Sequence, residues 1–171
     1  MVGTIEPRKG HFQTVKAFDM LWQKDYDVVL VIVGKQGWMV ESTIKLINNH
    51  PKLNNRLFWL YDVSDEYLEK IYEASSCFIM ASEGEGFGLP LIEAAKHKLP
   101  IIARDIPVYK EVASQHAYYF TNDTNPQTLA KAIEEWYNLY KENKHPKSEG
   151  MRYLTWEENV KRLLEAILCS R

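Results

Sequence analysis

The sequence is short of cysteine, of long apolar runs and of any excess of charge. Its two cysteines, Cys77 and Cys169, lack CxxC spacing, which argues against a disulfide framework or a cysteine metal site. The longest apolar run, Val28–Val33, is far below the roughly 20 residues that span a bilayer, and the N-terminus carries no signal-peptide pattern. We therefore expect a cytoplasmic protein, with any membrane contact peripheral and at the inner face.

The charge balance also excludes a class of partner. Twenty-one basic and 23 acidic residues give a net charge of −2, and 46% of the residues are hydrophobic. This is an ordinary globular composition, and it gives no support to nucleic-acid binding. With 171 residues and no internal repeats, we expect one domain spanning residues 1–171.

Apolar runs of strand character alternate about six times with segments of helical spacing. This alternation predicts an α/β domain with a parallel sheet and helices on both faces. The expected strands are the residues up to Thr4, then Val28–Val33, Leu57–Tyr61, Cys77–Ala81, Leu99–Ala103 and Ala117–Phe120. The expected helices are about residues 11–24, 40–49, 65–74, 89–98, 107–114, 125–141 and 155–168. The last helix carries an apolar stripe that is core or interface by default.

Residues 82–95 carry most of the chemical information. The apolar run Cys77–Ala81 leads into them, and three glycines within five residues then let the backbone turn sharply and approach a ligand closely. Pro90 suits the first turn of the helix that follows. That helix is apolar on nearly every side, so we expect it to be buried.

Glu93 is the acidic exception in this apolar helix. Helical side chains lean toward the N-terminus, so its carboxylate should point back at the glycine loop and at Glu85. A helix start favours an anion, and carboxylates accept hydrogen bonds from vicinal hydroxyls. A phosphate beside a polyol indicates a nucleotide sugar. Turn chemistry in the loop and dipole compensation by an acid form the alternative interpretation.

Arg8 and Lys9 stand just before Gly10 and the helix expected from about residue 11. Cations at this end of a helix oppose its dipole, so a local pair of them suggests that an anion binds nearby. Solvated surface charges are the alternative.

The pattern Ser-x-x-Glu-Gly-Phe-Gly-Leu-Pro-x-x-Glu-Ala, with Glu85 and Glu93 as its acids, resembles the glutamate-x7-glutamate signature of retaining glycosyltransferases of family 4. These enzymes have the GT-B fold. The resemblance covers motifs from Val2 to about Phe120 and helix layout to the end of the chain. It implies a Rossmann-like three-layer domain with about six strands, the donor-binding C-terminal half of a GT-B enzyme. No part of the chain resembles the N-terminal half, which supplies the acceptor site.

The resemblance also implies roles for individual residues. Glu85 would hold hydroxyls of the donor sugar, Glu93 the ribose diol, and Lys9 the diphosphate. Thr4 stands where the family often has an arginine, and Arg8 is expected to replace that charge from the same loop. The loop residues expected beside the donor are Gly86, Phe87, Gly88 and Leu89. Gly3, Gly34 and the backbone of Val63 are also expected to border the ligand, although a plain loop would explain Gly34 equally well.

The implied reaction is transfer of a hexose, with retention, from a nucleoside diphosphate sugar to a glycan acceptor in polysaccharide biosynthesis. Several similar bacterial surface-polysaccharide enzymes use GDP-mannose, but no residue here fixes the sugar or the base. Cations and a helix end would replace a metal, so neither a metal nor a cofactor is expected. The five histidines show no ligand spacing, and we expect surface or capping roles for them.

Because the acceptor-binding half is not part of this sequence, we do not expect the chain alone to carry out the transfer. The acceptor would bind through an N-terminal domain or a partner chain, and the isolated domain should be inactive. Two rivals share every motif: a non-enzymatic nucleotide-sugar binding subunit, and a GT-B sugar-nucleotide epimerase.

Overall fold

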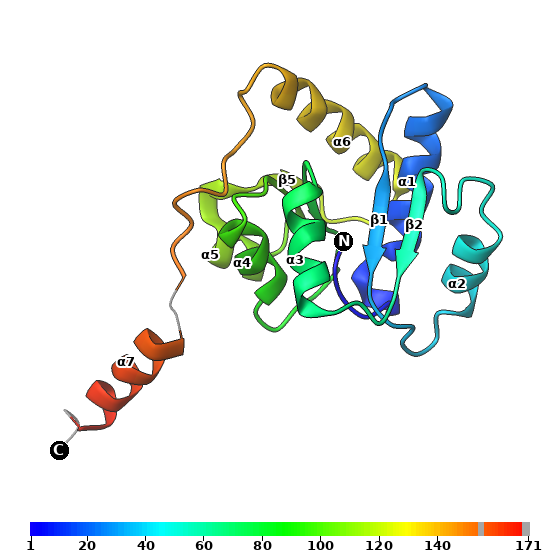
Figure 1. Ribbon diagram of the computed structural model, residues 1–171. Coiled ribbons are helices and arrows are strands. Elements are labelled where there is room, and N and C mark those ends of the chain that lie inside the picture. Colours follow the sequence, from blue (N-terminus) through cyan, green and yellow to red (C-terminus); the bar gives the residue numbers. More distant parts are fainter. Residues whose placement is uncertain (154–155, 169–171) are drawn as a thin grey trace.

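The computed structural model describes residues 1–153 and 156–168 and contains the predicted alternation of strands and helices (Figure 1). The strands are β1 (Leu30–Val33), β2 (Leu57–Leu60), β3 (Phe78–Met80), β4 (Ile101–Arg104) and β5 (Tyr118–Phe120). The α-helices are α1 (His11–Gln23), α2 (Glu41–Asn48), α3 (Asp65–Ala74), α4 (Leu89–Lys96), α5 (Pro107–Ala113), α6 (Pro126–Lys141) and α7 (Trp156–Leu168). Two short 3-10 turns, η1 (Pro7–Lys9) and η2 (Ser114–His116), precede α1 and β5.

The helix starts follow from local capping. The Ser64 hydroxyl accepts a hydrogen bond of 3.2 Å from the amide of Tyr67, which confirms Ser64 as the N-cap of α3. At α6, the side chain of Asn125 accepts from the Gln127 amide at 3.0 Å. Thr155, predicted as the first residue of the last helix, and Cys169 lie outside the described residues.

The strands are parallel, as predicted, but they form two sheets. One has the order β1-β2 and the other β3-β4-β5. Residues 1–5, predicted to end the first strand, run beside β1 and contribute only isolated bridges from Val2 to Val33 and from Ile5 to Gln36. The prediction of one continuous sheet of about six strands was therefore too simple. Nothing in the described chain pairs with both β1 and β3 to join the two sheets.

Helices cover both faces of the strands. One core cluster combines side chains of α1, α2 and α6 with β1 and β2, and the other combines α3, α4 and α5 with β3 and β4. Alternate residues of β3 divide between the clusters, because Ile79 faces the first while Phe78 and Met80 face the second. Such double-sided burial is typical of the parallel strands of an α/β domain.

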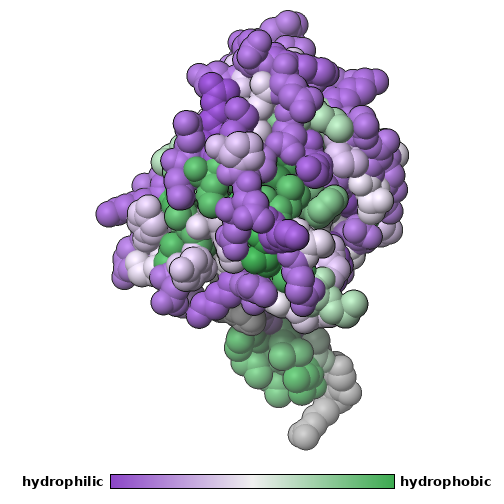
Figure 2. All heavy atoms as spheres, turned by 90° about the vertical axis from the view of Figure 1, so that its right-hand side faces the viewer, coloured by the Kyte–Doolittle hydropathy of each residue, from purple (hydrophilic) through white to green (hydrophobic). Residues whose placement is uncertain are grey.

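Two helices differ from the expectation for their apolar residues. In α4, Leu91, Ala94 and Ala95 are buried, but Leu89 is 54% exposed at the open start of the helix. The helix is thus buried on one side only. In α7, the apolar residues stand exposed, and the helix lies apart from the body of the molecule (Figures 1 and 2). These residues are Val160, Leu163, Leu164, Ile167 and Leu168. Within the described ranges, no helix is long and apolar enough to cross a membrane.

Candidate functional site

The turn η1 and the glycine loop after β3 pack directly on one another. The amide of Glu83 donates to the carbonyl oxygen of Arg8 at 2.8 Å. Gly10 has a φ of 72°, and a Cβ there would lie 2.3 Å from the carbonyl oxygen of Ala81. Only glycine fits this position, and it brings Arg8 and Lys9 to the mouth of α4.

Glu85 is the centre of the polar cluster at this mouth. Its Oε1 accepts from the Lys9 ammonium and, at 3.0 Å, from the Ser82 hydroxyl. Its Oε2 accepts from the Arg8 guanidinium at 3.0 Å, and the same guanidinium nitrogen also donates to the Gly84 carbonyl at 2.8 Å. A second nitrogen of Arg8 pairs with Glu6 at 3.1 Å. The structure therefore brings together three predicted site residues that are up to 77 positions apart in sequence.

These contacts fix the charge state of the cluster. Burial opposes ionisation of Glu85, but the hydrogen bonds from Lys9 and Arg8 outweigh it and hold the pKa of this carboxyl below its usual value. The hydrogen bond to Glu85 in turn raises the pKa of Arg8. Glu85 is thus a carboxylate at neutral pH and can only accept hydrogen bonds.

The start of α4 keeps its backbone donors free. Gly88 precedes the helix with a φ of 88°, and no side chain caps it. Among the described residues, no acceptor is bound to the amides of Phe87, Gly88 or Leu89. A Cβ at Gly84 or Gly86 would meet nothing within 4 Å, so the fold itself does not require glycine at either position. The loop thus combines open space beside Gly84 and Gly86 with N–H groups that have no described acceptor, and an anion site at a helix start requires such free N–H groups.

Glu93 lies one turn into α4 but not against Glu85. Its Oε2 accepts a hydrogen bond of 3.0 Å from the hydroxyl of Tyr72 in α3. The described contacts of Glu93 include none with Glu85. The prediction that Glu93 points back at Glu85 is therefore not confirmed, because Glu93 is held by Tyr72 of α3 and Glu85 by Arg8, Lys9 and Ser82.

The remaining predicted site residues lie at the ends of β1 and β2. A Cβ at Gly34 would lie 2.0 Å from the carbonyl oxygen of Gly3, so the backbones of these two glycines are in close contact. This contact leaves no room for a Cβ, so the fold itself requires glycine at position 34. Val63 is half-buried in the turn between β2 and α3.

The sequence analysis did not predict three residues that hold the site residues or the glycine loop in place. Ser82 was part of the motif but was not predicted to bind Glu85. Tyr72 gave no signal, because nothing local shows that α3 lies against α4. Arg104 at the end of β4 is fully buried and donates to the Ala81 carbonyl at 3.0 and 2.8 Å, beneath the glycine loop. Its position at the exit of a strand was the only available hint.

The histidines are more buried than predicted. His11, His50 and His145 are 3%, 8% and 6% exposed, and Nε2 of His50 lies 2.7 Å from Asp19. The expectation of a surface role was wrong for these three, although Nδ1 of His50 accepts a hydrogen bond of 3.1 Å from the Lys52 amide just beyond the end of α2, as a cap does. Three or more metal-ligating side chains do not cluster anywhere in the described ranges.

Comparison with known proteins identifies the family of the chain. Residues 1–153 match the family described as glycosyl transferases group 1. The serotype-specific mannosyltransferase WbdA of Escherichia coli is 55% identical over 165 residues, which are 96% of this chain and 20% of WbdA. The O-antigen chain mannosyltransferase RfbU of Salmonella typhimurium is 29% identical over 78% of this chain and 37% of RfbU.

A solved structure shares the fold. Alr3699/HepE of Anabaena, crystallised in complex with UDP-glucose, aligns with a TM-score of 0.75 over 99% of this chain and 48% of its own, at 18% identity. The present chain thus spans about one fifth to less than one half of these longer proteins. The family match covers most of the chain and includes the loop with Glu85, so the chain belongs to the group 1 glycosyl transferases.

Proposed function

We propose that the chain is the donor-binding half of a retaining glycosyltransferase that transfers mannose from a nucleoside diphosphate sugar to a glycan acceptor in O-antigen biosynthesis. Family membership supports the reaction class, and the printed names of WbdA and RfbU support the sugar and the product. GDP-mannose is the donor we favour on this basis.

The contact between Lys9 and Glu85 is the observation that carries the proposal. In a nucleoside diphosphate sugar, one glycosidic bond joins the sugar to the phosphate. A cation that holds the phosphate and a carboxylate that holds the sugar must therefore be neighbours. Lys9 and Glu85 meet this requirement at the free N–H end of α4.

The same groups can assist bond cleavage. As the glycosidic bond breaks, negative charge grows on the leaving diphosphate. Lys9, Arg8 and the free amides of Phe87, Gly88 and Leu89 would stabilise this charge more strongly than the ground state. These donors allow the proposed reaction to proceed without a metal ion.

Donor binding would rearrange the ion cluster. Without donor, Lys9 and Arg8 are both satisfied by Glu85. A diphosphate that bound the two cations would free the lone pairs of Glu85 for sugar hydroxyls. A glutamate carboxyl has an ordinary pKa well below 7, so Glu85 would stay an acceptor after the cations had moved to the diphosphate.

Glu93 is proposed to hold the ribose diol, with Tyr72 fixing its carboxylate. Gly3, Gly34, Gly86 and Val63 are proposed to border the donor through their backbones. The acceptor would be bound by parts of the polypeptide or a partner outside this chain. We expect the isolated chain to bind donor and to transfer nothing.

Calorimetric titration of the chain with guanosine, GDP and GDP-mannose, with EDTA or with Mg²⁺, tests the proposal. We expect GDP and GDP-mannose to bind much more tightly than guanosine, with no effect of Mg²⁺. Equal affinity for all three ligands would contradict a diphosphate site. With a longer polypeptide that includes an acceptor domain, sugar-nucleotide product formed without acceptor would instead favour the epimerase.

A further inference from the structure

Tyr109 of α5 carries a buried hydroxyl without a partner, close to the donor site. The residue is fully buried, and a Cβ at Gly88 would lie 3.4 Å from its ring, so the ring packs against the start of α4. Its carbonyl oxygen accepts a hydrogen bond of 3.1 Å from the Tyr119 hydroxyl. No described residue, however, forms a regular hydrogen bond with the hydroxyl of Tyr109 itself. An unpaired buried hydroxyl lowers stability, so its presence needs an explanation.

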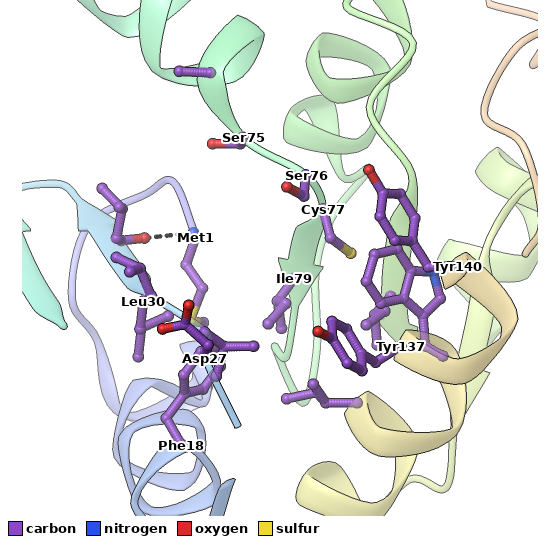
Figure 3. Close-up of a pocket in the computed structure, with 17 residues that line it drawn as sticks. Met1, Phe18, Asp27, Leu30, Ser75, Ser76, Cys77, Ile79, Tyr137 and Tyr140 are labelled. Carbon is purple, nitrogen blue, oxygen red and sulfur yellow. Dashed lines mark hydrogen bonds between the residues drawn. The ribbon is translucent and has the colours of Figure 1, made fainter. Parts of the chain in front are cut away.

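A cavity near the middle of the molecule does not supply the missing partner. This cavity of about 390 Å³ lies between the starts of β1 and β3, with Phe18, Ile79 and Tyr137 in its lining (Figure 3). Tyr109 is not among the described residues that line it. The candidate partners are therefore the side chains around the Tyr109 hydroxyl.

Hydrogen-bonding capacity distinguishes one of these side chains. Burial raises the pKa of Tyr109, so its hydroxyl keeps its proton and can donate it. The polar side chains close enough to act on this pKa are those of Ser82, Glu85, Arg104 and Arg8. Arginines have only donors, and both oxygens of Glu85 already accept hydrogen bonds. Ser82 donates its one proton to Glu85 at 3.0 Å, and no described residue donates to the Ser82 oxygen, which is therefore the free acceptor.

We propose that Tyr109 is a positioning residue for Glu85 in the donor-bound site: its hydroxyl donates to Ser82, and Ser82 donates to Glu85. The inference rests on the proposed function, in which Lys9 and Arg8 move from Glu85 to the diphosphate. Of the three side chains that donate to Glu85 in the described structure, Ser82 then remains. A hydroxyl that accepts a hydrogen bond donates more strongly, so Tyr109 compensates in part for the cations that have left.

The same arrangement explains why the hydroxyl is unpaired without donor. Lys9 and Arg8 then hold both oxygens of Glu85, and a stronger hydrogen bond from Ser82 is not needed. The hydroxyl of Tyr109 thus costs stability in the donor-free chain and contributes when the carboxylate holds a sugar. Its removal should therefore affect stability and donor affinity in different directions.

Tyr109→Phe, which keeps the ring and removes only the hydroxyl, tests this role. Calorimetric titration with GDP-mannose should show affinity reduced about fivefold, the contribution of roughly one neutral hydrogen bond. GDP has no sugar for Glu85 to hold and should bind with unchanged affinity. The Tm of the donor-free variant should stay the same or rise, because the lost hydroxyl has no described partner there.

Two further variants separate positioning from packing. Tyr118→Phe is the matched control, because the Tyr118 hydroxyl donates to Glu135 of α6 at 2.6 Å and not to the donor site. Its loss should change the affinity for neither ligand. In a chain that already carries Ser82→Ala, Tyr109→Phe should cause no further loss of GDP-mannose affinity, since the hydroxyl acts through Ser82.

Unchanged affinity for GDP-mannose in Tyr109→Phe would overturn this inference and leave the proposed function standing. Equal losses for GDP and GDP-mannose would also overturn it, because the ring would then matter only through its packing against α4. The same loss with and without Ser82→Ala would exclude action through Ser82. If the unmutated chain did not bind GDP-mannose, the proposed function would be wrong, and this inference with it.

Discussion

The hydroxyl of Tyr72 in α3 donates a hydrogen bond of 3.0 Å to Oε2 of Glu93 in α4. Tyr72 is 4% exposed and its ring stacks on His97 at 5.1 Å between ring centroids, so the position of the hydroxyl is fixed by packing. This hydrogen bond orients the carboxylate of Glu93, and no described residue bonds to its other oxygen.

Tyr72→Phe should weaken binding of a nucleoside diphosphate by up to about tenfold, because a hydrogen bond to a charged group contributes about 1.5 to 3 kcal/mol and only its orienting part is lost. Calorimetry with GDP measures the effect. Tyr67→Phe is the matched control, since Tyr67 lies on the exposed side of the same helix. A loss of stability without a change in affinity would mean that Tyr72 supports the fold and not Glu93 as a ligand.

Arg104→Met should destabilise the chain by about 3 kcal/mol or more, because it removes the hydrogen bonds of a fully buried guanidinium. These bonds go to the carbonyls of Ala81 and Asp123 and to the side chain of Gln13; the Asp123 carbonyl keeps a second donor in the Gln13 amide. Arg56→Met, at a half-exposed arginine, is the control. Urea unfolding measures both variants. If Arg104→Met and Arg56→Met lowered the free energy of unfolding by the same small amount, the hydrogen bonds of the buried guanidinium would contribute little to stability.

Lys9→Ala should weaken GDP binding far more than guanosine binding, because the ammonium would contact phosphate only. The expected loss for GDP is tenfold or more, from a charge-assisted bond of about 1.5 to 3 kcal/mol. Lys16→Ala is the control. It removes a charge from α1 that pairs with Asp19 and not with the glycine loop, so it should change the affinity neither for GDP nor for guanosine. Equal losses for both ligands in Lys9→Ala would contradict a phosphate role.

His11 should make the fold sensitive to acid. Its imidazole is 3% exposed, and neither ring nitrogen has a partner among the described residues. Burial, followed by the Met1 ammonium and Lys9, lowers its pKa from 6.5 to about 3. Between these values the unfolded chain binds the proton and the folded chain does not. Stability contributed by the neutral ring is therefore complete above about pH 6.5 and is lost as pH falls toward 3, by at most about 1.4 kcal/mol per pH unit.

His11→Leu should flatten this dependence. Urea unfolding near pH 7 and near pH 4 gives the difference in the free energy of unfolding for each variant. His116→Gln, at the partly exposed histidine of η2, should keep the full dependence. An unchanged difference in His11→Leu would show that other groups cause the acid sensitivity.

The strand and helix pattern could be predicted because its causes are local. Apolar runs such as residues 28–33, caps such as Ser64 and Asn125, and prolines at helix starts all act within a few residues. The division into two sheets could not be predicted, because strand pairing joins distant residues. Val28 and Val29 belong to an apolar run but not to β1, since pairing with β2 begins at Leu30.

The site could be predicted only where a motif connected distant residues. The resemblance assigns Lys9 and Glu85 to one donor site without predicting an ion pair, and the structure brings the two side chains into contact. No local pattern connects Arg104 with Gln13, 91 positions away, or Tyr72 with Glu93. An arginine after a short strand could equally face solvent, and only the packed fold shows it fully buried.

The central claim is that Glu85 holds the transferred sugar and Glu93 the ribose, and titration of Glu85→Gln and Glu93→Gln with GDP and GDP-mannose tests it most directly. Glu83→Gln, in the same loop, is the control. Glutamine keeps the shape and removes the charge, at a cost of about 1 to 3 kcal/mol for a bound diol. We predict that Glu93→Gln weakens both ligands about tenfold or more and that Glu85→Gln weakens only GDP-mannose. A lower Tm for Glu85→Gln with unchanged affinity for GDP-mannose would contradict the account.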